Sequence, residues 1–401
     1  MDVHKSYKKP TLDKDLDKFT YIEEATTNVG RGLAAPGFAF LFIILSGAVA
    51  GIYMTGTHGA AVIMAAAAIG AYMALNIGAN DVANNVGPAV GSRAMTMVTA
   101  LIIAALFESA GALIAGGDVV GTISKGIINP ELVNDPAVFM AAMMAALVSS
   151  ALWINLATWL GAPVSTTHSI VGGVMGAGIA AAGISSVNWP TMGGIVASWV
   201  ISPLLGGLIA AFFLAIIKTF IIYQDDKIAA ARRWVPVLIA IMTGCFAAYL
   251  AMKGLKHLVK ISLPQALAGG LAIGLVTWAA VRPLIRMQSE GLENRNQSLR
   301  KLFSLPLICS AALLSFAHGA NDVANAVGPL AAVVHTAALG EVVSKVAIPL
   351  WVASAARTSS VATAASLASP RRMRRSRNGC LRSAEASRIW PGSGDKCEIM
   401  Q

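Results

Sequence analysis

The feature that most constrains this chain is an eleven-residue stretch that occurs twice and puts an aspartate into an apolar segment each time. The first copy, GANDVANNVGP, runs from Gly78 to Pro88, and the second, GANDVANAVGP, runs from Gly319 to Pro329. The copies differ only where Asn85 is matched by an alanine. A match of this length indicates an internal duplication, so the fold must present the same polar element twice.

The composition indicates the surroundings of this element. Hydrophobic residues make up 56% of the chain, charged residues make up 12%, and the mean hydropathy is +0.67. Soluble domains carry about 25% charged residues, so a 401-residue chain with so little charge cannot cover a soluble globule. We predict an all-α fold, a multi-pass transmembrane helical bundle, because helices satisfy their backbone hydrogen bonds internally in lipid.

Several apolar runs are close in length to the about 20 residues that a helix needs to cross a bilayer. They lie near 36–55, 59–76, 94–117, 137–160, 168–184, 191–217, 235–252, 264–281, 303–317, 323–335 and 339–356. Asn, Asp, Gly and Pro residues interrupt the apolar runs around 59–88 and 303–335, so we expect broken or re-entrant helices there. A membrane protein that repeats such an element in both halves has the outline of a secondary transporter.

The same pattern divides the chain into six regions. They are a polar N-terminal tail (1–35), an extra N-terminal transmembrane helix (36–58), a first transporter repeat (59–217), cytoplasmic loops with intervening transmembrane helices (218–302), a partial second repeat (303–352) and an Arg/Ser-rich tail (353–401). Lys and Arg gather in segments 218–234 and 282–301, and the positive-inside rule makes their side cytoplasmic. We expect no cleaved signal peptide, because the N-terminal tail has no short apolar core followed by a small-residue cleavage site.

Asn80 and Asp81 carry the chemistry of the duplicated motif. A carboxylate near the bilayer centre costs about 2.5–3.5 kcal/mol on insertion scales, so Asp81 must face a cavity, a cation or a proton. Together the two residues offer hard oxygen ligands that suit a small cation such as sodium. The alternative is a packing element with Asp81 in a buried hydrogen-bond network, and the duplication argues against it.

A second polar cluster follows Pro163, where Ser165, Thr166 and Thr167 precede an apolar run. Ser and Thr at this position cap a helix, and their hydroxyls with the free backbone amides also suit a tetrahedral oxyanion. An ordinary helix cap is the alternative. Glu108 is a third buried acid, which could carry a proton, bind a second cation or pair with a polar neighbour.

Three histidines, His168, His318 and His335, are isolated in the sequence. For each of them a structural role is favoured over metal ligation. The four cysteines show no metal spacing either. We therefore expect no resident metal and no cofactor.

At these motifs the chain resembles the inorganic phosphate transporter family, which includes the sodium–phosphate symporters of animals. The resemblance covers about residues 59–352 and rests on five stretches. These are GANDVAN at 78–84, VGS at 90–92, FESAGA at 107–112, PVSTTHS at 163–169 and SFAHGANDVANAVGP at 315–329. It implies two inverted repeats with the substrate between them, and symport of phosphate with Na⁺ or H⁺ across the inner, or plasma, membrane.

The resemblance also implies roles for individual residues. The phosphate-binding set is Asp81, Asp322, Ser165, Thr166 and Thr167, and the cation-coupling set is Asn80, Asn321, Asp81, Asp322 and Glu108. The implied partners are inorganic phosphate, Na⁺ or H⁺, the lipid bilayer and, on family analogy, a second copy of the chain. Nucleic acid is not an expected partner.

The chain departs from the family pattern at its end. A second PVSTTH would fall near 404–409, past Gln401, and the composition changes after Val352. We interpret this as a truncation or frameshift, rather than a lipid-binding tail, and expect weak or absent transport. The alternatives are a sulfate or metal–phosphate permease, a non-transporting phosphate sensor and an inactive remnant. Without a GK[ST] loop or HExxH, the chain is not expected to be an enzyme.

Overall fold

The computed structural model describes residues 36–56, 59–115, 126–129, 132–133, 135–254 and 261–342. Their regular structure is helical, with one isolated β-bridge between Ile128 and Val187. Eight of the helices are long and apolar enough to cross a membrane, so the chain is a multi-pass membrane protein, as the composition predicts. The two predicted tails, 1–35 and 353–401, lie outside the described residues.

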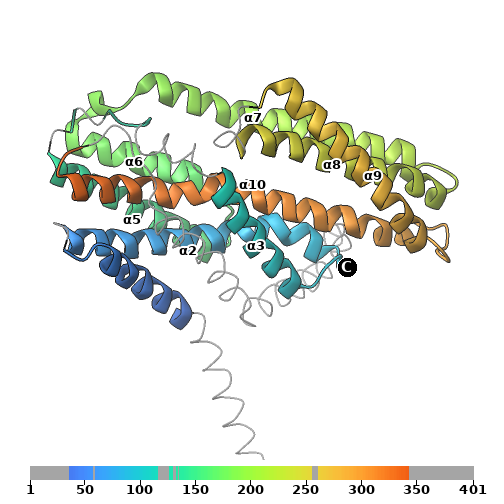
Figure 1. Cartoon of the computed structure of the whole chain (residues 1–401), viewed down its shortest axis with the longest axis horizontal. Coiled ribbons are helices and arrows are strands. Elements are labelled where there is room, and N and C mark those ends of the chain that lie inside the picture. Colours follow the sequence, from blue (N-terminus) through green and yellow to red (C-terminus); the bar gives the residue numbers. More distant parts are fainter. Residues whose placement is uncertain are drawn as a thin grey trace, which may run out of the picture. The chain divides into compact units, whose positions relative to one another are not determined.

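An apolar helix, Pro36–Tyr53, comes first in the described sequence. The following elements are α2 (Ala60–Gly91), α3 (Met97–Ala115), α5 (Pro136–Leu160), α6 (Thr166–Ala182), η2 (Ile184–Ser186), α7 (Trp189–Ile217), η3 (Lys218–Ile222), α8 (Lys227–Lys253), α9 (Leu263–Gln288) and α10 (Asn296–Leu339) (Figure 1). The first copy of the duplicated motif lies on α2 and the second on α10.

Local sequence signals set the ends of α5 and α6. Asp135 caps α5 by accepting a hydrogen bond from the backbone N–H of Ala137, and a proline occupies the first turn. The helix ends at Gly161, whose left-handed φ of 74° suits glycine. Shortly afterwards Ser165 caps α6 by accepting from the N–H of His168. The short connection makes α5 and α6 a hairpin with the polar cluster at its tip.

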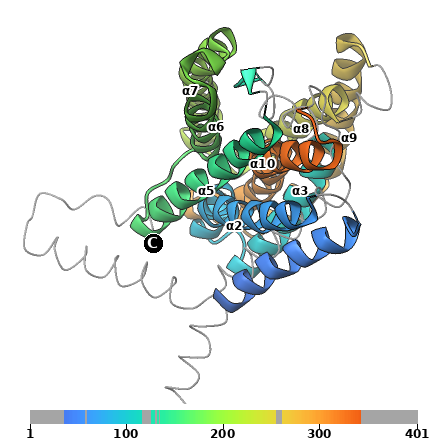
Figure 2. The ribbon, with the colours of Figure 1, turned by 90° about the vertical axis from the view of Figure 1, so that its left-hand side faces the viewer.

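Helix α10 packs on α2, α3 and α5. Figures 1 and 2 show it beside α2, and α3 crosses it obliquely in Figure 1. Its closest approach is to α3. A Cβ at Gly319 would overlap the carbonyl oxygen of Glu108, and a Cβ at Gly111 would overlap that of Phe316. Small residues allow membrane helices to approach this closely. The crossing brings Glu108 of α3 against His318 of α10.

The duplicated motif does not interrupt its helices. Helix α2 continues through Pro88, and α10 continues through Pro306 and Pro329. The prediction of broken or re-entrant helices at 59–88 and 303–335 is therefore wrong for the described structure. Several of the motif's polar side chains, among them Asp81 and Asp322, bond to side chains of neighbouring helices. The inverted orientation of the two repeats stays a prediction.

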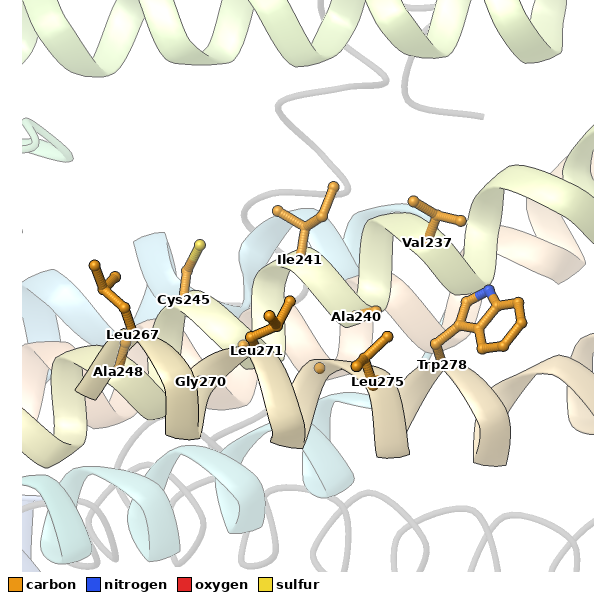
Figure 3. A pocket seen from close by; sticks show the side chains of 12 residues that line it. Val237, Ala240, Ile241, Cys245, Ala248, Leu267, Gly270, Leu271, Leu275 and Trp278 are labelled. Atoms are coloured by element: carbon orange, nitrogen blue, oxygen red, sulfur yellow. The ribbon is translucent and has the colours of Figure 1, made fainter. Parts of the chain in front are cut away.

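Helices α8 and α9 pack tightly because Gly244 and Gly270 bring their backbones together. Beside this contact, Ile241 of α8 and Leu271 of α9 project to the same side, along an apolar groove of about 500 Å³ (Figure 3). Val, Ala, Ile, Gly, Cys, Leu and Trp residues line this groove. This lining has almost no hydrogen-bonding or charged groups that could orient a charged solute. A site for such a solute must therefore lie outside this groove, at the polar motifs.

We predict that Gly319→Ala destabilises the protein by about 1–3 kcal/mol, the usual cost of overpacking a tight contact. The new methyl group would meet the backbone of α3, which cannot rotate away as a side chain could. Thermal unfolding of detergent-purified protein measures the change. Gly87→Ala is the matched control, because a Cβ at Gly87 meets nothing within 4 Å and alanine is the better helix former. Equal unfolding midpoints for the two variants would contradict the close crossing.

Candidate functional site

The polar motifs open into a cavity of about 680 Å³ between α2, α6, α7 and α10. Its described lining combines carboxylates, amides, hydroxyls, imidazoles and an indole, without lysine or arginine. The lining residues are Asp81, Asn84, Asn85, Ser165, Thr166, Thr167, His168, Ser198, Trp199, Ser202, His318, Asn321 and Asp322. A hydrophilic cavity among apolar helices is the expected place for buried ionisable residues.

The first turn of α6 faces both aspartates of the duplicated motif. Thr166 Oγ1 donates a hydrogen bond to Asp81 Oδ2 at 2.9 Å, and Thr167 Oγ1 donates to Asp322 Oδ1 at 3.0 Å. The first backbone N–H groups of a helix lack intrahelical acceptors, and the helix dipole adds a partial positive charge there. The start of α6, capped by Ser165, therefore gathers donors that suit an oxyanion, and the sequence predicted this donor set.

His318 lies at the centre of the acidic groups. Its Nε2 is 3.3 Å from Asp81 Oδ2 and 3.1 Å from Asp322 Oδ2, and its Nδ1 is 3.2 Å from Glu108 Oε1. Only 9% of the side chain is exposed. The histidine is not isolated, as it appears in the sequence, because it joins carboxylates from α2, α3 and α10.

Glu108 is a buried partner of this cluster, with 3% of its side chain exposed. Besides the contact with His318, its Oε1 accepts a hydrogen bond from Asn85 Nδ2 at 3.3 Å. Of the three roles open for Glu108 from the sequence, the structure shows pairing with polar neighbours. Its predicted part in cation coupling stays a prediction.

Asn80 points away from the cavity. It is 8% exposed, and its Nδ2 donates to Thr158 Oγ1 at 3.0 Å and to the carbonyl of Ala162 at 3.4 Å. Its Oδ1 accepts from the backbone N–H of Val164 at 3.4 Å. The amide therefore holds the α5–α6 connection in place. A direct role of Asn80 in cation coupling stays a prediction, and its contacts in this structure are those of a positioning residue.

The corresponding residues of the second copy have different surroundings. Asn321 is exposed in the cavity, although it matches Asn80 in sequence. Asn325, which matches Asn84, donates its Nδ2 to Asp322 Oδ1 at 3.0 Å and to Thr167 Oγ1 at 3.1 Å. Identical sequences therefore give unequal environments.

Sequence reasoning missed His318, Asn325 and Asn85 as members of the site. A signal was present for the first two, because His318, Asp322 and Asn325 follow an i, i+4, i+7 spacing and share one helix face. Asn85 follows Asp81 at i+4 on α2, but its partner Glu108 is on another helix, so this spacing does not reveal the contact.

The fold and the cavity define a multi-pass helical membrane protein with a polar cavity among its helices. Residues 77–367 match the model of the phosphate transporter family, and the chain belongs to this family. The match continues past Val352 and so enters the region that the composition marks as a distinct tail.

Individual relatives agree with this assignment. A protein of Helicobacter pylori strain J99, assigned as a phosphate permease, is 49% identical over 335 residues. These residues are 82% of this chain and 62% of that protein, so the chain spans less than two thirds of its relative. A protein of Pyrococcus abyssi, also assigned as a phosphate permease, is 38% identical over 71% of this chain and 69% of its own length. A solved structure described as the sodium-dependent phosphate transporter is 37% identical, with a TM-score of 0.70 over 77% of this chain and 75% of that one.

We predict that Asn80→Ala lowers the free energy of unfolding by about 1–3 kcal/mol, because the Thr158 hydroxyl and two backbone groups of the α5–α6 connection lose their hydrogen-bond partner. Thermal or denaturant unfolding in detergent measures the loss. Asn84→Ala is the matched control, because Asn84 is exposed and makes only a 3.4 Å bond to the Asn80 carbonyl; it should cost less than about 0.5 kcal/mol. Equal losses in both variants would show that Asn80 does not hold this connection.

Proposed function

We propose that this chain binds inorganic phosphate in the α2–α6–α10 cavity and carries it across the membrane by secondary active symport with Na⁺ or H⁺. The proposal rests mainly on two hydrogen bonds at the cavity wall. Thr166 donates to Asp81, and Thr167 donates to Asp322. Membership of the phosphate transporter family supports the substrate. The arrangement supplies both donors and acceptors to one small tetrahedral anion.

The carboxylates favour phosphate over sulfate. Near neutral pH phosphate keeps at least one proton, so it can donate a hydrogen bond to an ionised Asp81 or Asp322. Hydrogen bonds that involve a charged group contribute about 1.5–3 kcal/mol each. Sulfate has no proton to donate and meets uncompensated repulsion, although the hydroxyls of Thr166 and Thr167 can donate a hydrogen bond to either anion.

The charge balance of the cavity accounts for a coupled cation. Asp81, Glu108 and Asp322 are opposed by one imidazole, and the described lining adds no lysine or arginine. An anion approaching this group is repelled unless cations enter with it. The likeness to a structure named as a sodium-dependent phosphate transporter supports Na⁺ as that cation. The exposed carboxamide of Asn321 offers it an oxygen ligand.

We predict that Asp81→Asn lowers uptake of labelled phosphate by about tenfold to a hundredfold, the effect of losing one charged hydrogen bond. The measurement uses cells that lack their own phosphate transport and express the chain at matched membrane levels. Asp226→Asn is the control, because it makes the same chemical change at the N-cap of α8, outside the cavity, where asparagine also caps well.

The outcomes separate the candidate functions. Uptake that depends on Asp81, resists excess sulfate and falls when Na⁺ is replaced by choline at constant pH supports sodium-coupled phosphate symport. Uptake that follows external pH but not Na⁺ supports protons as the coupling ion. Equal uptake by the Asp81 and Asp226 variants contradicts the assigned site, and binding of phosphate without uptake indicates a non-transporting sensor.

A further inference from the structure

We propose that Asp81, His318 and Asp322 form a binding site for a divalent transition-metal ion on the cavity wall, with Glu108 orienting the imidazole. One ligand atom from each of the three residues lies within 4.8 Å of the others. This site goes beyond the alkali cation or proton of the proposed function and does not require transport. It also differs from the expectation, based on sequence alone, of no resident metal.

The distances fit a small ion. In a tetrahedral zinc site with bonds of about 2.0–2.1 Å, neighbouring ligand atoms are about 3.3–3.4 Å apart. His318 Nε2 lies 3.3 Å from Asp81 Oδ2 and 3.1 Å from Asp322 Oδ2. A metal ion can therefore bind among these atoms with small side-chain movements and without rearrangement of α2 or α10.

The donor types select the class of ion. Imidazole nitrogen suits Zn²⁺, Cu²⁺, Fe²⁺ and Ni²⁺, whereas Na⁺, Mg²⁺ and Ca²⁺ prefer oxygen ligands. Asp81 and Asp322 together balance a charge of two. Three protein ligands leave a further coordination position, which here opens to the cavity because all three residues line it.

The surroundings of His318 match those of a metal-binding imidazole. Ligating histidines characteristically direct their second ring nitrogen at a carboxylate, which fixes the tautomer and the ring orientation. Here Nδ1 lies 3.2 Å from Glu108 Oε1, and Asn85 donates to the same oxygen at 3.3 Å. With a proton on Nδ1 and none on Nε2, the Nε2 lone pair faces two carboxylate oxygens. A cation among the three atoms, like a proton on one of them, makes that contact favourable.

A metal ion at this position would connect the two copies of the duplicated motif. Asp81 belongs to the first copy on α2, and Asp322 belongs to the second copy on α10. The close α3–α10 crossing at Gly319 supplies Glu108 from a third helix. The i, i+4 spacing of His318 and Asp322 is visible in the sequence, but the third ligand, Asp81, is brought to them only by tertiary packing.

Equilibrium binding of radioactive Zn²⁺ to the purified full-length chain in detergent tests the proposal, together with the visible absorption spectrum of the Co²⁺-loaded protein. We predict saturable binding of one Zn²⁺ per chain that excess NaCl displaces no better than choline chloride at equal ionic strength. Glu108→Gln should weaken binding about 10–100-fold, as changes to the residue that orients a ligating histidine do. His318→Gln should weaken it further and abolish the intense Co²⁺ bands of a four- or five-coordinate site.

His168→Gln is the matched control, because it makes the same substitution in the same cavity outside the three-residue cluster. It should keep wild-type Zn²⁺ affinity and the Co²⁺ spectrum. Asp322→Asn provides a second loss-of-ligand variant if His318→Gln does not fold, as judged by its unfolding midpoint. Equal Zn²⁺ affinity of the wild type and the folded ligand variants would overturn the proposal, as would the absence of saturable binding to the folded wild type. Phosphate uptake without Zn²⁺ binding would overturn the metal site alone.

Discussion

The burial of three carboxylates among apolar helices is the constraint on which the rest of the site depends. Asp81, Glu108 and Asp322 would each be costly in lipid or in a dry protein interior without compensation. The structure compensates them with hydroxyl and amide donors and with one shared imidazole, His318. The features around the cavity can be understood as ways of delivering these partners. The capped start of α6 brings the hydroxyls, and the glycine crossing of α3 and α10 brings Glu108 to the imidazole.

The duplicated motif shows that identical residues acquire different tasks from their neighbours. The hairpin of α5 and α6 follows the first copy in the described chain, so Asn80 is buried against it while Asn321 is exposed in the cavity. Asn325 bonds to Asp322 and Thr167, whereas Asn84 bonds only to the backbone of its own helix. The surroundings of the two copies are therefore unequal although their sequences match.

Much of this architecture could be predicted from the sequence, because it follows from composition and local signals. Mean hydropathy gives the membrane class, and Ser165 behind a proline gives the start of α6. The family resemblance assigned Thr166 and Asp81 to one phosphate site, and the structure brings their side chains together, while the binding itself stays a prediction. Tertiary contacts account for what was missed. The helices continue through Pro88 and Pro329, although proline is typical of a helix break. The contacts of His318 with carboxylates on α2 and α3 form only in the folded chain, so no local signal reveals them.

The central claim is that the start of α6 and the two aspartates of the duplicated motif form one phosphate site. An experimental structure of the full chain in saturating phosphate tests it most directly. Our account predicts tetrahedral density within hydrogen-bond distance of the Thr166 and Thr167 hydroxyls and next to Asp81 and Asp322. Phosphate bound elsewhere, or an empty cavity at saturating phosphate with the helices placed as described, would contradict it.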